Sequence, residues 1–143
     1  MAKMTVGRDV QSTVRLMEDL MEIPVQVQDE MLLAEAQVVY REQREAALSG
    51  LDEMGYGTGA TAASLTIGKP VGSRGRSVSL TFKGSRGTGK ARRSNSTVAF
   101  FNEVGSRHVR SRMWIKQANE RCADEAVSAA AKVYDEWLRQ RGQ

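Results

Sequence analysis

A glycine-rich segment offers the most familiar chemistry in this sequence. Residues 84–91 read Gly-Ser-Arg-Gly-Thr-Gly-Lys-Ala, which fits the phosphate-binding pattern G-x-x-x-x-G-K. Two requirements of that motif are missing. Ala91 stands where a Ser or Thr would hold magnesium. The following residues lead into a predicted strand, not into a helix whose amides would bind phosphate. We therefore expect a basic loop without a bound nucleotide.

Basic side chains gather around this loop, with no acid among them. They are Arg74, Arg76, Lys83, Arg86, Lys90, Arg92 and Arg93. Such a cluster can neutralise phosphates through salt-dependent contacts that do not read base sequence. Aromatic residues for base stacking are scarce, since the nearby Phe82 is expected to point inward, so we do not expect single-strand recognition. Three alternatives stay open: a protein partner, passing double-stranded DNA, or a solvated loop without a partner.

The remaining reactive side chains indicate no catalytic or metal centre. The one histidine, His108, lies between Arg107 and Arg110 and is expected to be an exposed polar residue. The one cysteine, Cys122, falls on an apolar helical stripe and is expected to be a small core residue, not a nucleophile. We therefore predict no catalytic residues, no cofactor and no metal, and a chain that is not an enzyme.

Charge is distributed unevenly along the chain. Residues 1–53 carry five Lys/Arg and eleven Asp/Glu, a net charge of −6. Residues 54–119 carry twelve Lys/Arg and one acid, a net charge of +11, and residues 120–143 carry a net charge of −1. Opposite charges on different parts of one chain suit stacking against a surface of opposite sign.

Length and composition favour a single domain made in a cytoplasm. A chain of 143 residues is long enough for one hydrophobic core. No apolar run approaches the ~20 residues of a membrane helix, and the first residues contain no apolar signal core. A single cysteine cannot form an internal disulfide. We expect neither a membrane contact nor a secretory signal.

Apolar spacing predicts three helices. Residues 9–21 form a short amphipathic pattern within an expected N-terminal helical arm, residues 1–23. Its apolar face comprises Val10, Val14, Met17 and Met21. A long helix is predicted from Val25 to Ser49, because Pro24 suits its start and Gly50 its end. A second is predicted from Met113 to Arg141. Its stripe comprises Ile115, Ala118, Cys122, Ala126, Ala129, Val133 and Trp137.

The middle of the chain predicts a small antiparallel sheet. Residues 77–82 alternate polar and apolar, which is typical of a half-buried strand, and residues 97–101 are predicted as a second strand. Residues 83–96 between them are expected to form a flexible basic hairpin loop. Residues 60–67 fit either a helical turn or the entry to a strand. The element order predicts one α+β domain over residues 1–143, with a small antiparallel sheet packed by two long helices.

Two sequence elements resemble those of one protein family. Residues 98–105, Val-Ala-Phe-Phe-Asn-Glu-Val-Gly, precede a short arm and a helix that opens with Met113-Trp114. This order is similar to the tail-completion (neck, or head–tail joining) proteins of long-tailed bacteriophages. Glu103 and Gly105 match the acidic residue and glycine of that family, whereas Met113-Trp114 replaces its usual Pro-Phe.

The upstream element of the family is also recognisable. Thr58, Gly59 and Ser64 align with its T-G-x-L-x-x-S pattern, although residues 60–62 replace the usual leucine. These matched positions and Trp114 are candidates for family-specific contacts or subunit interfaces. Both tryptophans, Trp114 and Trp137, are expected to be packing anchors of the last helix.

The resemblance implies a structural virion protein. Several copies, expected to be six, would form a ring in the neck that joins the head connector to the tail and completes the DNA channel. Its partners would be further copies, the connector or stopper, and the tail terminator or tail tube proteins, with DNA passing nearby without specific recognition. Assembly would take place in the host cytoplasm. The alternatives are a tail terminator or tube-capping ring, and a small basic DNA-binding protein.

Overall fold

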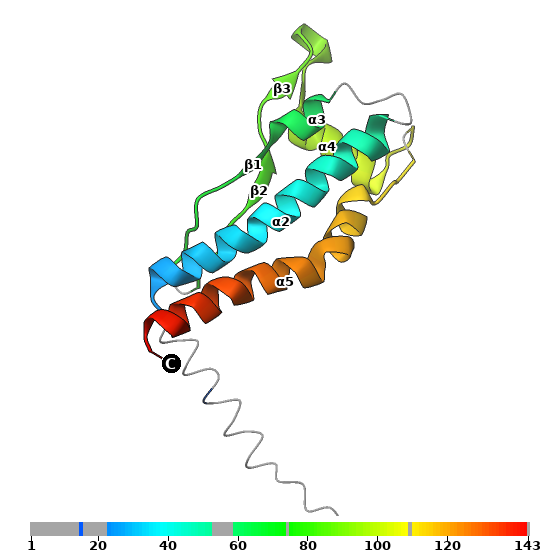
Figure 1. Ribbon diagram of the computed structural model, residues 1–143. Helices are drawn as coiled ribbons and strands as arrows, with labels where there is room; N and C mark the ends of the chain where they lie inside the picture. The colour runs from blue at the N-terminus through cyan, green and yellow to red at the C-terminus, as the bar shows by residue number, and fades with distance from the viewer. Residues whose placement is uncertain (1–14, 16–22, 53–58, 74, 109, 143) are drawn as a thin grey trace, which may run out of the picture.

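Two long helices form the frame of the molecule (Figure 1). The computed structural model describes residues 15, 23–52, 59–73, 75–108 and 110–142. Helix α2 spans Val25–Asp52 and α5 spans Trp114–Gln140, and they lie side by side along their length. Both predicted long helices are confirmed, although α2 continues through Gly50. The predicted N-terminal helix lies outside the described residues except for Arg15, which is helical and exposed.

Small side chains let α2 and α5 approach closely. Ala46, Ala47 and Ala118 pack together near the start of α5, and Val38 packs on Cys122 and Ala126 further along. The stripe predicted for the last helix is therefore confirmed as its buried face. The Cys122 side chain is 1% exposed, and burial raises the pKa of its thiol. It is a core residue, as predicted.

Polar contacts cross the same seam. The Gln43 amide donates a 2.8 Å hydrogen bond to Asn119 Oδ1, and Gln43 is itself buried. At the surface Arg41 pairs with Glu125 at 2.5 Å. Exposed ion pairs add little stability, so the partly buried hydrogen bond of Gln43 contributes more to how the two helices align.

A two-stranded sheet lies beside α2. Helix α3, Ala60–Ser64, leads directly into β1, Leu65–Ile67, so both structures considered for residues 60–67 are present. Strand β1 pairs antiparallel with β2, Leu80–Phe82, with Leu65 opposite Phe82. The predicted strand over residues 77–82 is thus confirmed in its second half. Leu80 and Phe82 are half-buried and Thr81 is exposed, which is the alternation expected.

The predicted strand over residues 97–101 is wrong, because this segment is helix α4, Asn95–Val104. Its β-branched and aromatic residues favour a strand by propensity, but the ends favour a helix. The Ser94 side chain accepts a 3.1 Å hydrogen bond from the Thr97 amide, an N-cap contact. Gly105, with φ 81°, ends the helix. The partner of β2 is therefore β1.

Residues 83–96 contain a hairpin of their own, which we call the basic hairpin. Strand β3, Ser85–Arg86, pairs antiparallel with β4, Arg93–Ser94, and a short 3₁₀ helix, Gly89–Ala91, forms the tip. The flexible basic loop predicted for residues 83–96 is not confirmed. The basic hairpin projects beyond the end of the molecule where α3 and α4 lie (Figure 1). The architecture is α+β, with two long helices and two small antiparallel sheets.

Candidate interaction surfaces

Arg76 of the basic segment is held by an ion pair inside the molecule. Its guanidinium donates two hydrogen bonds to the Asp29 carboxylate, at 2.7 and 2.8 Å. It also donates to the backbone carbonyls of Pro70 and Gly72. These hydrogen bonds hold the pKa of Asp29 below its ordinary value. Arg76 therefore ties the segment before β2 to the first turns of α2 and is not available to a phosphate.

Arg86 also points into the structure. Its Nε donates to Asn95 Oδ1 at 2.9 Å and a terminal nitrogen donates to Thr61 Oγ1 at 2.6 Å. Asn95 and Thr61 are both buried. Asn95 in turn donates to the Lys83 carbonyl at 2.8 Å. This network anchors the base of the basic hairpin to α3 and α4.

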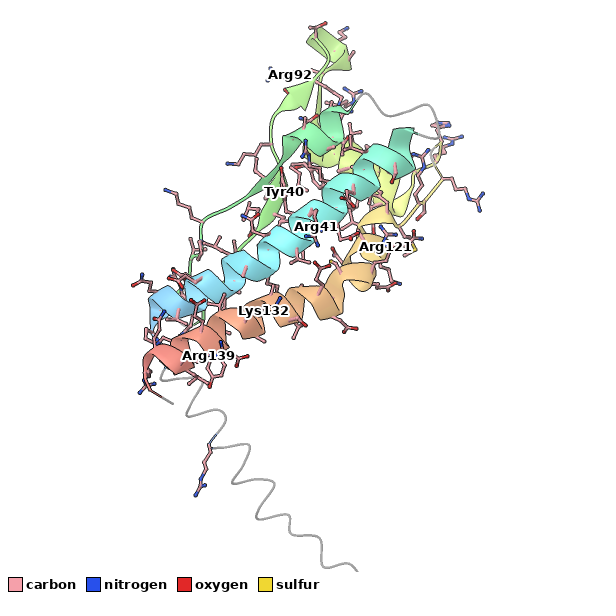
Figure 2. The ribbon with its side chains drawn as sticks, viewed as in Figure 1. Tyr40, Arg41, Arg92, Arg121, Lys132 and Arg139 are labelled. Atoms are coloured by element: carbon pink, nitrogen blue, oxygen red, sulfur yellow. The ribbon has the colours of Figure 1, made fainter. Side chains whose placement is uncertain are left out.

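The exposed cations of the segment lie on the basic hairpin. They are Lys83, Lys90, Arg92 and Arg93. Arg92 lies near its outer end (Figure 2) and donates to Ser85 Oγ across the hairpin. Arg93 donates to the backbone carbonyls of Lys90 and Arg92. The basic hairpin therefore presents positive charge at one end of the molecule. Arg74 lies outside the described residues.

The turn of the basic hairpin accounts for the glycine motif. Gly87, with φ 82°, and Gly89, with φ 55°, form the turn of the basic hairpin. At Gly87 an added Cβ would lie 2.7 Å from the Ala91 carbonyl oxygen. The glycines are thus required by a tight turn between antiparallel strands. Helix α4 follows the motif, contrary to the predicted strand, but strand β4 separates it from Lys90, so the motif does not lead directly into a helix N-terminus as a phosphate-binding loop does.

Glu103 caps the start of α5 from a different helix. Its carboxylate accepts hydrogen bonds from the backbone amides of Ile115, at 2.6 Å, and Lys116, at 3.1 Å. The Glu103 carbonyl also accepts from Met113 N at 3.0 Å and from Ser111 Oγ at 2.8 Å. A negative charge here is favourable because the first amides of a helix lack intrahelical acceptors. Glu103 therefore joins α4 to α5.

The other residues of this motif shape the same junction. Gly105 adopts a positive φ at the end of α4, and Met113 is left-handed, with φ 47°, immediately before α5. Trp114 is 4% exposed and packs edge-to-face on Phe82, with ring centroids 5.7 Å apart. Its indole Nε1 is buried without an acceptor among the described residues. Trp114 is therefore a core residue that anchors the start of α5. Trp137 is half-buried and lies against Tyr134.

The upstream motif residues form the start and end of α3. Gly59 is its N-cap, with φ 73°, a conformation that glycine adopts at low cost. The Ser64 hydroxyl donates to the Thr61 carbonyl at 2.8 Å. Both positions therefore shape the local backbone where α2 gives way to the sheet. Thr58 lies outside the described residues.

One face of α4 exposes large apolar side chains, which sequence reasoning missed. Phe100 is 57% exposed, Phe101 is 42% exposed and Val104 is 51% exposed. The two phenyl rings lie 6.2 Å apart. We call these three residues the α4 apolar face. The predicted strand concealed it, since the helical spacing of Phe100 and Val104 places them on one face only if the segment is a helix. The Ser94 cap and Gly105 were the available signals.

His108 is exposed, as expected. No group of three or more His, Cys, Asp or Glu side chains in the described part of the chain could hold a metal ion. Within the same residues, none of the helices combines the length and the apolar character that crossing a membrane requires.

Comparisons with known proteins add no assignment. The chain matches no family model, no curated protein and no solved structure. The resemblance to phage tail-completion proteins therefore stays a prediction from short motifs.

Proposed function

We propose that this protein is a non-enzymatic structural subunit that forms a ring, expected to be hexameric, in the neck of a long-tailed bacteriophage. The observation that carries the proposal is the α4 apolar face. Monomeric proteins seldom expose adjoining large apolar side chains, and such a patch marks a surface that packs against another protein. In a ring each subunit supplies such a surface to its neighbour.

Charge supports the same proposal. The basic hairpin presents exposed cations at one end of the molecule, whereas the first 53 residues of the chain are strongly acidic. Surfaces of opposite sign on one chain favour association of copies in a head-to-tail manner. The neck role itself comes from the motifs at Gly59, Ser64, Glu103 and Gly105, which resemble those of tail-completion proteins. The expected partners are the connector or stopper and the tail terminator or tail tube proteins.

Two alternative functions can be tested by experiment. A tail terminator or tube-capping ring would use the same surfaces, and its position in the assembled particle would distinguish it. A small basic DNA-binding protein is favoured by the exposed cations of the basic hairpin. In that case binding to double-stranded DNA would be tight and persist near physiological salt.

The decisive experiment is the assembly state of the purified full chain. Light scattering and negative-stain imaging are expected to show closed rings, and labelled antibody against the protein is expected to mark the head–tail junction of the virion. A chain that stays monomeric at every concentration, and does not localise to the junction, would overturn the proposal. Filter binding to duplex DNA across a salt series tests the DNA-binding alternative on the same preparation.

A further inference from the structure

The α4 apolar face sets the chemistry of its partner. Phe100, Phe101 and Val104 require apolar side chains opposite them. The arm that follows α4 adds Arg107 and Arg110, which are exposed, directly after this face in the chain. A partner is therefore expected to combine an apolar stripe with acidic residues at its edge.

Residues 10–21 of this chain have that combination. Their apolar stripe, Val10, Val14, Met17 and Met21, recurs at helical spacing. Residues 9–22 contain four acids, Asp9, Glu18, Asp19 and Glu22, against the single base Arg15. Arg15 is helical and exposed in the structure. We infer that residues 10–21 of one copy dock as an amphipathic helix on the α4 apolar face of a second copy. This contact deepens the ring proposal and rests on it.

The reach of the segment requires a second copy. Ile23, which follows it, is buried at the first end of α2, whereas Ala99 of α4 packs on Ala46 and Ala47 near the other end (Figure 1). From Val25 to Ala46 the helix rises about 32 Å, but a helix over residues 10–22 spans only about 18 Å. An extended segment could reach further but would divide its stripe between two faces. A helical segment therefore meets the α4 apolar face of a neighbour.

Charge argues against a contact with the nearer groove of the same chain. That groove lies beside the start of α2 and is lined by Ile23, Met31 and Leu32, among others. Its lining also includes Glu35, which would repel the acids of residues 9–22, and Arg76, whose charge is already paired with Asp29. The exposed Arg107 and Arg110, which follow the α4 apolar face in the chain, would attract these acids. The observations therefore favour exchange between copies.

This exchange would be heterologous, because the donated segment and the receiving face are different surfaces. Contacts of this kind repeat around a ring when the rotation closes. The α4 apolar face would then become buried in the assembly. The contact would also weaken with salt, since part of it is an attraction between exposed charges.

Mixed cross-linking of full-length chains tests the contact. A Val14→Cys variant is mixed with a Phe100→Cys variant and treated with a short bis-maleimide. The matched control replaces Phe100→Cys by Val127→Cys, since Val127 is 63% exposed on α5. Unmodified chains give the background of the buried Cys122. Cross-linked heterodimers are expected in the Phe100→Cys mixture and only background in the control. Because the cysteines lie on different chains, the product reports a contact between copies.

The outcomes separate this inference from the ring proposal. Rings without a preferred cross-link to position 100 would overturn the inference and leave the ring in place. Cross-linked dimers that never close would support the contact and contradict the ring. Monomers without a cross-link would overturn both. As a second measurement, Met17→Asp and Phe101→Asp are each expected to dissociate the assemblies, whereas Val127→Asp is not.

Discussion

At the scale of single residues, long-range polar contacts hold the short elements in place. Glu103 supplies the two acceptors that the first turn of α5 lacks, and Asp29 orients Arg76. Both carboxylates act on segments far from them in the sequence. Sequence spacing identified Glu103 as a motif residue but could not show what it binds, because its partners are amides twelve and thirteen residues later.

Replacing Glu103 is expected to weaken the fold. Glu103→Ala leaves two helix-terminal amides without an acceptor and should lower the free energy of unfolding by about 1–2 kcal/mol. Glu120→Ala is the matched control, because Glu120 is exposed on α5 and its contact with Lys116 is a 4.0 Å surface pair. Urea denaturation measures both variants. Equal stability of the two variants would show that Glu103 does not stabilise the junction.

The Asp29–Arg76 pair gives stability a dependence on pH. The pKa of Asp29 is lower in the folded protein than its ordinary value of 3.8, so the pair stabilises the fold fully above that value. This contribution is lost as pH falls through the lower folded pKa. Asp29→Asn is therefore expected to lower the unfolding midpoint at pH 7 and to make less difference near pH 3. Thermal unfolding at both pH values checks this.

A control substitution isolates that effect. Asp124→Asn removes an acid from the exposed surface of α5. It should change the midpoint little at either pH. If Asp29→Asn and Asp124→Asn behave alike across the pH range, the ion pair does not stabilise the native state.

At the scale of elements, the long helices and part of strand β2 could be predicted from sequence, whereas α4 and the basic hairpin could not. The stripe from Ile115 to Trp137 repeats over many turns, so periodicity alone determined α5. Helix α4 is only ten residues long and rich in strand-favouring residues. Its identity depends on capping and on packing of Ala99 against α2 and α3, which a short window does not contain. The error at α4 also gave β2 the wrong partner and concealed the α4 apolar face.

Substitution of Ser94 tests whether its N-cap contact stabilises α4. Ser94→Ala removes the side chain that accepts from the Thr97 amide and is expected to cost about 1 kcal/mol of stability. Ser128→Ala, at an exposed position inside α5, should cost nothing, since alanine favours a helix interior. Chemical denaturation compares the two. A neutral Ser94→Ala would mean that tertiary packing alone sets the start of α4.

At the scale of the whole molecule, the fold divides the basic residues between internal contacts and the exposed surface. The basic hairpin projects at one end, and its anchoring residues Arg86 and Asn95 point inward while its outer cations face solvent. The sequence located the cluster of basic residues correctly. It could not distinguish the cations that make internal contacts from those that stay exposed. Only the fold shows that Arg76 and Arg86 serve structure, whereas Lys90, Arg92 and Arg93 remain at the surface.

Neutralising the exposed cations of the basic hairpin tests their effect on DNA binding without disturbing the fold. The triple variant Lys90→Gln, Arg92→Gln and Arg93→Gln should leave the unfolding midpoint nearly unchanged, since all three side chains are exposed. Weak binding to duplex DNA at low salt should fall, with the slope of log affinity against log salt reduced by up to about 3. The control variant carries Arg121→Gln, Lys132→Gln and Arg139→Gln on α5, labelled in Figure 2.

The two triple variants together test whether the position of the positive charge matters for DNA binding. Both lose the same net charge, so a difference between them reports the place of the charge and not its amount. Equal losses of DNA affinity would mean that the basic hairpin is not a preferred contact. Filter binding across a salt series measures both.

The alanines between α2 and α5 have a consequence for how this protein can change over evolution. Where two backbones touch through methyl groups, a bulkier side chain would force them apart. Outward positions of the same helices carry no such limit. Selection on α2 and α5 therefore acts on the spacing of their small residues. Distant descendants would keep this spacing after their charges and loops had diverged.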